Sequence, residues 1–279
     1  MLMRPGQAKP QPQPGQRIGQ SPLDIVLFEH DPELARAYVD AGITHFIVDT
    51  ESKNKHERQE GFDTEIAPVS IRSVGPLTRI PRAYVSCRIN GFCDSTRDEV
   101  EAAINEGVHR IFLPMVSSVE EVQAFIDAVG GRCEAAILIE TQHATTIAAE
   151  IARLPVGAVY VGLNDLAISR RSQFIFSAVR DGTVRRMREA FAGRQFGFAG
   201  VTALGRGFPI PCRMLLAEMA ALDCTFSFAR RSFRKHMAGR DVARGVARIQ
   251  TYWRMLMDRV PQRIEHDRTR LANLIAQYE

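Results

Sequence analysis

The sequence predicts an α/β protein of the (βα)₈ barrel, or TIM barrel, class. Eight short apolar runs alternate with amphipathic stretches between residues 24 and 257. Most of these runs are continuously apolar, which is typical of parallel strands that are covered on both faces. An open, doubly wound sheet is the alternative, but eight parallel strands in about 210 residues favour closure into a barrel.

The segment before the first apolar run has a different composition. Residues 1–22 are rich in Pro, Gln and Gly and have almost nothing to bury, so we expect a disordered tail. The N-terminus has no apolar stretch of the kind found in signal peptides, and no run approaches the roughly 18 residues that span a bilayer. Five cysteines show no CxxC spacing, which indicates reduced thiols. We therefore expect a cytoplasmic protein with no membrane partner.

The strands are predicted from runs of β-branched, aromatic and other apolar residues. In chain order they are DIVLFE at 24–29, THFIVD at 44–49, AYVSCRIN at 83–90, HRIFLPM at 109–115, EAAILIET at 134–141, AVYVGLN at 158–164, FGFAGVTA at 196–203 and TFSFA at 225–229.

The helices are predicted from amphipathic periodicity between the strands. Asp31, Ser95 and Ser118 are expected to cap the first three clear ones, because each precedes a Pro or acidic first turn. The stretch 64–80 is the poorest helix candidate, since it contains Pro and Gly. The clear helices, in order, are 31–41, 94–106, 118–129, 143–153, 183–192, 210–222 and 239–257.

The chain divides into a tail at 1–22, a barrel domain at 23–258 and a helical extension at 259–279. Residues 230–279 hold 12 Lys or Arg against 5 Asp or Glu, although the whole chain has a net charge of only +4. Basic stretches of this kind bind nucleic acid in some proteins, but the helical spacing favours a solvated or subunit-contacting helix. We expect no nucleic-acid partner.

Charged residues mark the ends of several predicted strands. Functional side chains of a barrel gather at the carboxyl ends of its strands. Asp49 and Glu51 follow the second strand, Arg88 lies at the end of the third, and Glu140 and Asp165 follow the fifth and sixth. Strand-end acids also serve as helix caps, which is the plain structural alternative for Glu140 and Asp165.

Two carboxylates on adjacent strands suit a hard divalent cation. Mg²⁺ typically binds one or two protein carboxylates and keeps its other positions for water and substrate. Such a cation chelates a 2-oxo acid and stabilises its enolate as a Lewis acid. Arg88 would then bind a substrate carboxylate or the developing oxyanion.

Several motifs agree in order, spacing and residue type with one known family. They are GI at 42–43, VDTE at 48–51, RING at 88–91, EGV at 106–108, FLPMVSS at 112–118, IET at 139–141, IA at 151–152 and VGLNDL at 161–166. Over residues 24–255 the chain resembles the HpcH/HpaI aldolase and citrate lyase β-subunit family, most specifically from 106 to 166.

The resemblance implies a phosphoenolpyruvate/pyruvate-type TIM barrel that uses Mg²⁺ or Mn²⁺. Glu140 and Asp165 match the family's metal ligands, and Arg88 matches the arginine that binds substrate and stabilises the enolate. Asp49 and Glu51 match the acidic positions that organise waters around the metal. The resemblance also implies that the backbone near Gly162 and the loop after Thr202 line the substrate pocket. It further implies that the eighth helix, which here contains Trp253, packs on a neighbouring subunit in a homotrimer or homohexamer.

The sequence departs from the family pattern at Ser52. Aldolases of the HpaI type have a proton-transferring His there, and the citrate lyase-like relatives have an acid. His56 is the candidate replacement as general base, and Lys53 is a candidate ligand for a substrate anion, although the KNKHERQE stretch is equally typical of a solvated loop.

The sequence thus predicts a metal-dependent carbon–carbon lyase, of the class II aldolase type, that acts on a small carboxylate through a pyruvate-like enolate. Two alternatives stay open. One is a lyase of CoA esters of the citrate or malyl type, for which residues 230–235 (RRSFRK) would supply a basic rim. The other is a non-catalytic barrel that has lost its base. The second substrate, the physiological direction, the base and the choice of metal are left undetermined by the residues.

Overall fold

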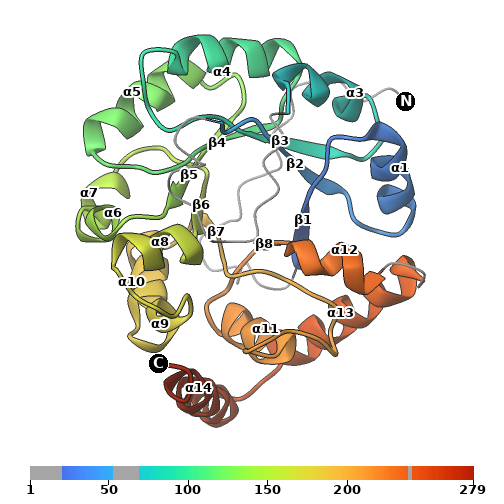
Figure 1. The fold of residues 1–279 in the computed structure, drawn as a ribbon, viewed down its shortest axis with the longest axis vertical. Helices are drawn as coiled ribbons and strands as arrows, with labels where there is room; N and C mark the ends of the chain where they lie inside the picture. Colours follow the sequence, from blue (N-terminus) through green and yellow to red (C-terminus); the bar gives the residue numbers. More distant parts are fainter. Residues whose placement is uncertain (1–20, 53–68, 238–240) are drawn as a thin grey trace.

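Eight parallel strands form the centre of the molecule, with helices in a ring around them (Figure 1). The computed structural model describes residues 21–52, 69–237 and 241–279. The predicted (βα)₈ barrel is confirmed. The strands are β1 (Asp24–Phe28), β2 (His45–Asp49), β3 (Tyr84–Arg88), β4 (Arg110–Leu113), β5 (Glu134–Ile139), β6 (Ala158–Val161), β7 (Gln195–Phe198) and β8 (Phe226–Phe228).

The sheet runs in the order β7-β6-β5-β4-β3-β2-β1-β8 and curls back on itself. A parallel bridge between Val201 and Ala229, just beyond the ends of β7 and β8, joins its two edges. Gly197 allows the close approach of these strands, because a Cβ at this position would collide with the carbonyl oxygen of Phe226. The carboxyl ends of all eight strands are thereby brought to one mouth.

The helices lie outside the strands. They are α1 (Pro32–Asp40), α3 (Val74–Thr78), α4 (Thr96–Asn105), α5 (Val119–Val129), α6 (Gln142–Thr146), α7 (Ala148–Ile151), α8 (Leu163–Ser169), α9 (Ser177–Arg180), α10 (Thr183–Ala190), α11 (Cys212–Ala221), α12 (Arg231–Met237), α13 (Val242–Met257) and α14 (Pro261–Ala276). A 3₁₀ turn at Ile71–Ser73 precedes α3, in the part of 64–80 that the structure describes. In these same described segments, no helix is long and apolar enough to cross a membrane.

The helix caps agree with the sequence at two of three positions. Asp31 accepts hydrogen bonds from the backbone N–H groups of Glu33 and Leu34, and Ser118 accepts one from Glu121. Ser95 was expected to do the same for α4, but its hydroxyl instead donates to Oε1 of Glu99 at 2.7 Å. The reason is that Ser95 has helical backbone angles, whereas a capping side chain needs an extended residue.

Several predicted elements differ from the structure. The single helix expected at 143–153 is two short helices, α6 and α7, which meet at Ile147. The strand expected at 158–164 ends at Val161, and α8 begins at Leu163. The sequence did not predict α8, α9 or α12. An apolar run does not distinguish a buried strand from the buried first turn of the next helix, and Leu163 is buried in that turn.

Two apolar layers hold the barrel together. The inner layer combines aliphatic side chains with the aromatic rings of Phe112, Phe226, Phe228 and Tyr160, and the Tyr160 and Phe228 rings stack at 3.9 Å. The outer layer lies between the strands and the helices. A packed interior of this kind is typical of the fold and leaves chemistry to the strand ends.

Polar side chains close the end of the barrel opposite the mouth. Arg110 is buried and pairs with Oε2 of Glu134 at 2.6 Å, while its Nη2 also donates to Gln195 at 2.7 Å. Tyr84 donates its hydroxyl to the same carboxylate. His45, which begins β2, and His109, which precedes β4, lie at this end too, as expected from their places in the sequence. These groups therefore belong to the floor of the barrel.

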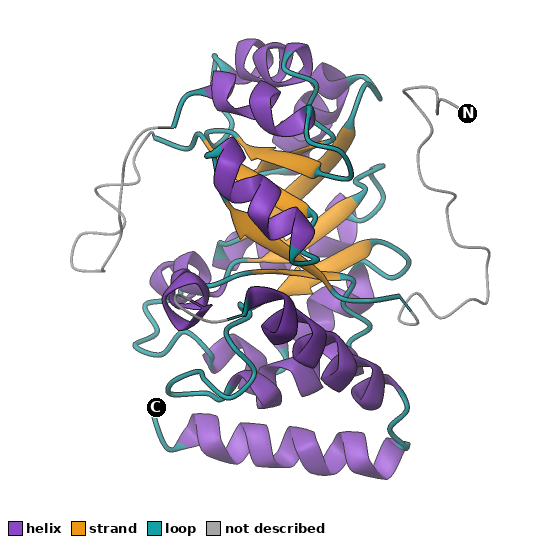
Figure 2. Cartoon of the chain, turned by 90° about the vertical axis from the view of Figure 1, so that its right-hand side faces the viewer, coloured by secondary structure: helices purple, strands orange, loops and turns teal. Residues whose placement is uncertain are grey.

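The C-terminal extension is the outermost helix, α14, which packs against α9 and α11 (Figure 2). The Trp253 indole of α13 is buried within its own chain, where its N–H donates to the carbonyl of Ser21 at 3.3 Å. The packing of the Trp253-containing helix on a neighbouring subunit stays a prediction. Residues 1–20, 53–68 and 238–240 lie outside the described residues.

Candidate active site at the carboxyl ends of the strands

The centre of the candidate site is an arginine held by an acid on the next strand. Asp49 and Arg88 end β2 and β3 and are direct partners in the sheet register. Nε of Arg88 donates to Oδ1 of Asp49 at 2.9 Å, and Nη2 donates to Oδ2 at 2.7 Å. This two-point contact fixes the plane of the guanidinium.

A second acid and an aromatic ring complete the surroundings of Arg88. Oε2 of Glu51 lies 3.4 Å from Nη2, and the guanidinium lies 5.6 Å from the centre of the Phe28 ring. Burial alone would lower the pKa of Arg88, but the charge and hydrogen bonds of Asp49, followed by the charge of Glu51, raise it above its ordinary value. Arg88 is a fixed cation at the mouth of the barrel.

Asn90 connects this pair to the next loop. Its backbone N–H and its side-chain amide both donate to Oε2 of Glu99, at 2.9 and 3.0 Å. Its Oδ1 accepts the backbone N–H of Ser52 at 2.9 Å. Ser52 is the last described residue before the segment that contains Lys53 and His56. Sequence reasoning missed Glu99, which reads as an ordinary first-turn acid of a helix.

Glu140 follows β5 directly and is only 4% exposed. Its Oε2 accepts the backbone N–H of Met115 at 3.2 Å. Met115 has a φ of 53°, in the left-handed region that residues with side chains rarely adopt. Strain of this type is found mostly at functional sites.

Gly162 gives Glu140 its place. A Cβ on Gly162 would collide with the Glu140 carboxylate and with its Cγ. The sequence assigned Gly162 to the substrate pocket through its backbone. The structure shows that the space left by the absence of a side chain on Gly162 is occupied by the Glu140 side chain.

Asp165 lies in the first turn of α8, two residues inside the helix, rather than at the end of a strand. Burial is the largest cause that raises the pKa of Glu140, and the charge of Asp165 is the next, while Arg88 lowers it. Two carboxylates that repel one another across a buried space are a fitting pair of oxygen ligands for a divalent cation. No group of three or more Asp, Glu, His or Cys suited to a metal occurs among the described residues, and Mg²⁺ does not require one.

The remaining predicted site residues are Thr202, Lys53 and His56. Thr202 is buried, and its hydroxyl donates to the carbonyl of Ala203. Its own carbonyl accepts the thiol of Cys212 at 3.3 Å. Lys53 and His56 lie outside the described residues, so their roles stay predictions.

The structure adds a buried acid that sequence reasoning left unused. Glu29 ends the first predicted strand and is 3% exposed. One oxygen accepts the backbone N–H groups of His30 and Asp31, and the other pairs with Arg234 of α12 at 2.9 Å. Its position at a strand end was the available signal, but the pairing with Arg234 required the fold.

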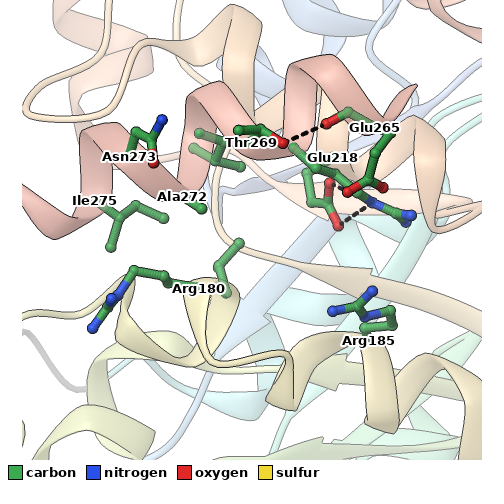
Figure 3. A pocket seen from close by; sticks show the side chains of 11 residues that line it. Arg180, Arg185, Glu218, Glu265, Thr269, Ala272, Asn273 and Ile275 are labelled. Atoms are coloured by element: carbon green, nitrogen blue, oxygen red, sulfur yellow. Dashed lines mark hydrogen bonds and ion pairs between the residues drawn. The ribbon is translucent and has the colours of Figure 1, made fainter. Parts of the chain in front are cut away.

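A hollow of about 250 Å³ lies away from the mouth, between α14 and the α9–α10 region. Figure 3 shows Arg180 and Arg185 facing the α14 side chains across it. Arg268 contacts both carboxylate oxygens of Glu218 at 3.2 and 3.3 Å. Burial raises the pKa of Glu218 even though Arg268 lowers it. We interpret the contact between Arg268 and Glu218 as part of the interface that attaches α14 to α11.

Comparison with solved structures gives the fold's relatives. A citrate synthase, SbnG, is 16% identical, with a TM-score of 0.59 over 79% of this chain and 91% of that one. An HpcH/HpaI aldolase from Desulfitobacterium hafniense is 17% identical, with a TM-score of 0.60 over 83% and 93%. Protein CitE from Mycobacterium tuberculosis, solved with magnesium and pyruvate, is 15% identical, with a TM-score of 0.57 over 92% and 99%.

No model of a known family matches the chain, and no curated protein matches it either. The structural neighbours are HpcH/HpaI aldolase and citrate lyase proteins, the family that the motifs resemble. At identities of 14–17% these likenesses establish the shared barrel and leave the activity to be argued from the site.

Proposed function

We propose that the protein is a metal-dependent carbon–carbon lyase that forms or cleaves an aldol bond next to a pyruvate-like 2-oxo acid. The observation that carries this proposal is the buried Glu140, whose pKa is raised by burial and by Asp165, at the same barrel mouth as the fixed cation Arg88. Neighbours of the same fold support it, since one of them was solved with magnesium and pyruvate.

Glu140 and Asp165 are the residues that would hold Mg²⁺ or Mn²⁺. When bound, the cation would supply Lewis-acid polarisation of the 2-oxo acid. Glu140 is oriented for this by the Met115 N–H and by contact with Gly162. Asp165 is carried by the rigid first turn of α8.

Arg88 would stabilise the negative charge that develops on the ketone oxygen when a proton leaves the neighbouring carbon. Asp49 occupies Nε and one N–H of Nη2, so the N–H groups of Nη1 are the donors left for the substrate. Because Asp49 holds the guanidinium in advance, little reorganisation is needed in the transition state.

Proton transfer requires a base near the substrate carbon. Asp49 and Glu51 would organise water there, as acids beside Arg88, the first half-buried and the second buried. His56 is our candidate for the base, and Lys53 for an additional anion ligand. Both follow Ser52, whose backbone is fixed by Asn90.

The CoA-ester alternative has less support, because Arg234, one of the basic residues of the 230–235 cluster, pairs with Glu29. The non-catalytic alternative rests on Ser52. We further propose a homo-oligomer, a trimer or hexamer, working in the cytoplasm. Analytical ultracentrifugation tests the oligomer.

The decisive experiment is exchange of deuterium into the methyl group of pyruvate, followed by NMR with and without Mg²⁺ or Mn²⁺. We expect exchange that requires the metal and falls by at least about 100-fold in Arg88→Ala, since one preorganised donor to an oxyanion contributes roughly this much. Arg36→Ala, on the exposed face of α1, is the matched control and should exchange like the wild type. Absence of exchange with either metal would reject the pyruvate-enolate function.

A further inference from the structure

Arg230 is the first residue after the bridge that closes the barrel. Ala229 pairs with Val201, and the backbone N–H of Arg230 donates to the carbonyl of Val201 at 2.9 Å. The closure of β7 onto β8 therefore places Arg230 at the carboxyl ends of the strands, which is the end that holds Arg88 and Glu140.

A glycine makes room for the Arg230 side chain. A Cβ on Gly200 would collide with Cγ of Arg230 and lie 3.1 Å from its Cδ. Gly200 follows Ala199, whose φ of 60° turns the chain at the end of β7. The stem of Arg230 thus lies across the β7 end, half-buried, in the same way that Glu140 lies against Gly162.

The guanidinium of Arg230 differs from those of Arg88 and Arg234 in its ion pairing. Arg88 pairs with Asp49, and Arg234 pairs with Glu29. Arg230 has no carboxylate or hydrogen-bond partner for its guanidinium within residues 21–52, 69–237 and 241–279. Burial lowers its pKa, with only the nearby Tyr160 and Cys212 acting in the other direction. A partly buried cation in this setting favours an anionic ligand.

In the proposed reaction a second cation could bind a substrate anion that Arg88 does not bind. Of the five N–H groups of Arg88, two donate to Asp49, and Glu51 lies 3.4 Å from Nη2. The Nη1 donors of Arg88 suffice for one oxyanion. A substrate with a second anionic group needs another partner, and Glu140, Asp165 and Glu51 would repel it.

We propose that Arg230 binds an anionic group, carboxylate or phosphate, on the carbonyl partner that the enolate attacks. This inference rests on the proposed lyase function. In the condensation direction the enolate carbon forms a bond to the partner's carbonyl carbon, and the electron pair of that C=O bond moves to its oxygen, which takes up a proton. The anionic group takes no part in the bond changes and serves to hold the partner at Arg230.

Paired acceptors test the proposal. Glyoxylate is compared with the neutral glycolaldehyde, and glyceraldehyde 3-phosphate with glyceraldehyde, each with pyruvate and Mg²⁺. We expect the wild type to prefer the anionic member of one pair, and Arg230→Gln to reduce that ratio of kcat/KM by roughly 10- to 100-fold, the usual effect of losing a charge-assisted hydrogen bond. The two pairs separate carboxylate from phosphate.

Lys235→Gln is the matched control, because it removes one positive charge from the exposed face of α12 and should keep the preference. An unchanged ratio in Arg230→Gln would overturn the inference. So would a wild type that condenses neutral and anionic acceptors equally well.

A residue-specific measurement separates this inference from the lyase function. Phenylglyoxal modifies accessible arginines, and mass spectrometry of the digested protein reports each one. We expect glyoxylate or inorganic phosphate to protect Arg230 and to leave exposed Arg36 unprotected. Protection without pyruvate exchange would support the anion site while rejecting the lyase. Exchange without protection would support the lyase and reject the anion site.

Discussion

At the scale of single residues, glycine decides where the acids of this barrel point. Gly162 and Gly157 bracket β6, and a Cβ on either would collide with a glutamate at one end of the neighbouring β5: Glu140, directly after the strand at the mouth, or Glu134, its first residue at the floor. The two positions therefore present the same steric problem at opposite ends of one strand.

We expect Gly162→Ala to abolish metal-dependent exchange into pyruvate, because the added methyl displaces the Glu140 carboxylate. Gly157→Ala displaces Glu134 from Arg110 and should lower the melting temperature while keeping the exchange, since the floor lies at the other end of the barrel. NMR exchange rates and thermal melts of both variants make the comparison. Equal losses of exchange would contradict the assignment of Glu140.

The residue scale is also where sequence reasoning was least complete. Arg88, Glu140 and Asp165 were selected from their positions after apolar runs and from the motifs. Glu99 was missed, Glu29 was left without a role, and Arg230 was considered only as a member of the basic stretch at 230–235. Glu29 and Arg230 depend on neighbours far along the chain, Arg234 and Gly200, which the local pattern does not contain. The bond between Glu99 and Asn90 spans nine residues and depends on the path of the chain between β3 and α4.

At the scale of elements, α14 is attached to the barrel by charge as well as by apolar contact. Arg268 of α14 pairs with Glu218 of α11, and Arg259 donates to the carbonyl of Ala217. Leu271 and Ile275 of α14 are buried in the same region. These charged and apolar contacts thus join the C-terminal helix α14 to α11 of the barrel.

We expect Arg268→Ala to destabilise the protein by about 1–3 kcal/mol, because it leaves the Glu218 carboxylate buried without its cation. The loss should grow with pH. Burial already raises the pKa of Glu218, so ionisation increasingly favours the unfolded state as pH rises from the unfolded pKa to the folded pKa, and removal of Arg268 increases this penalty. Below the unfolded pKa both states are protonated and the variant should approach the wild type.

Thermal or urea unfolding at about pH 4 and about pH 8 measures the effect. Arg270→Ala, on the exposed side of α14, is the control and should show little loss at either pH. A loss for Arg268→Ala that is larger at the lower pH would contradict the role given to Glu218.

At the scale of the whole molecule, metal binding should be visible in global stability. A ligand that binds only the folded protein stabilises it by mass action. We expect Mg²⁺ or Mn²⁺, at about 100 times its Kd, to raise the melting temperature by about 5–10 °C. Glu140→Gln should abolish this rise and the metal-dependent exchange, because it removes a carboxylate of the proposed pair.

Glu134→Gln is the control for this shift, since it alters a half-buried carboxyl at the floor of the same strand. It should lower the melting temperature without metal, and should retain the rise on addition of metal. The same rise in Glu140→Gln as in the wild type would place the metal elsewhere.

The sequence by itself determined the number, order and parallel character of the strands, and so the barrel. It also determined that Glu140 and Arg88 stand at the carboxyl ends of strands. The reason is that continuous apolar runs and their spacing are local properties, readable without knowledge of any contact. Its errors were local ambiguities of the same kind, such as the strand at 158–164, where buried Leu163 belongs to a helix.

Only the tertiary structure decided which charges meet. The register of β2 against β3 places Asp49 beside Arg88. The Glu140 side chain occupies the space that a side chain at position 162 would need, and the closure of β7 onto β8 places the Arg230 side chain against Gly200. These are contacts between residues far apart in the chain, whose distances depend on strand register and on the absence of a single side chain. Such distances exist only once the barrel has closed, and they govern the chemistry that we propose for its mouth.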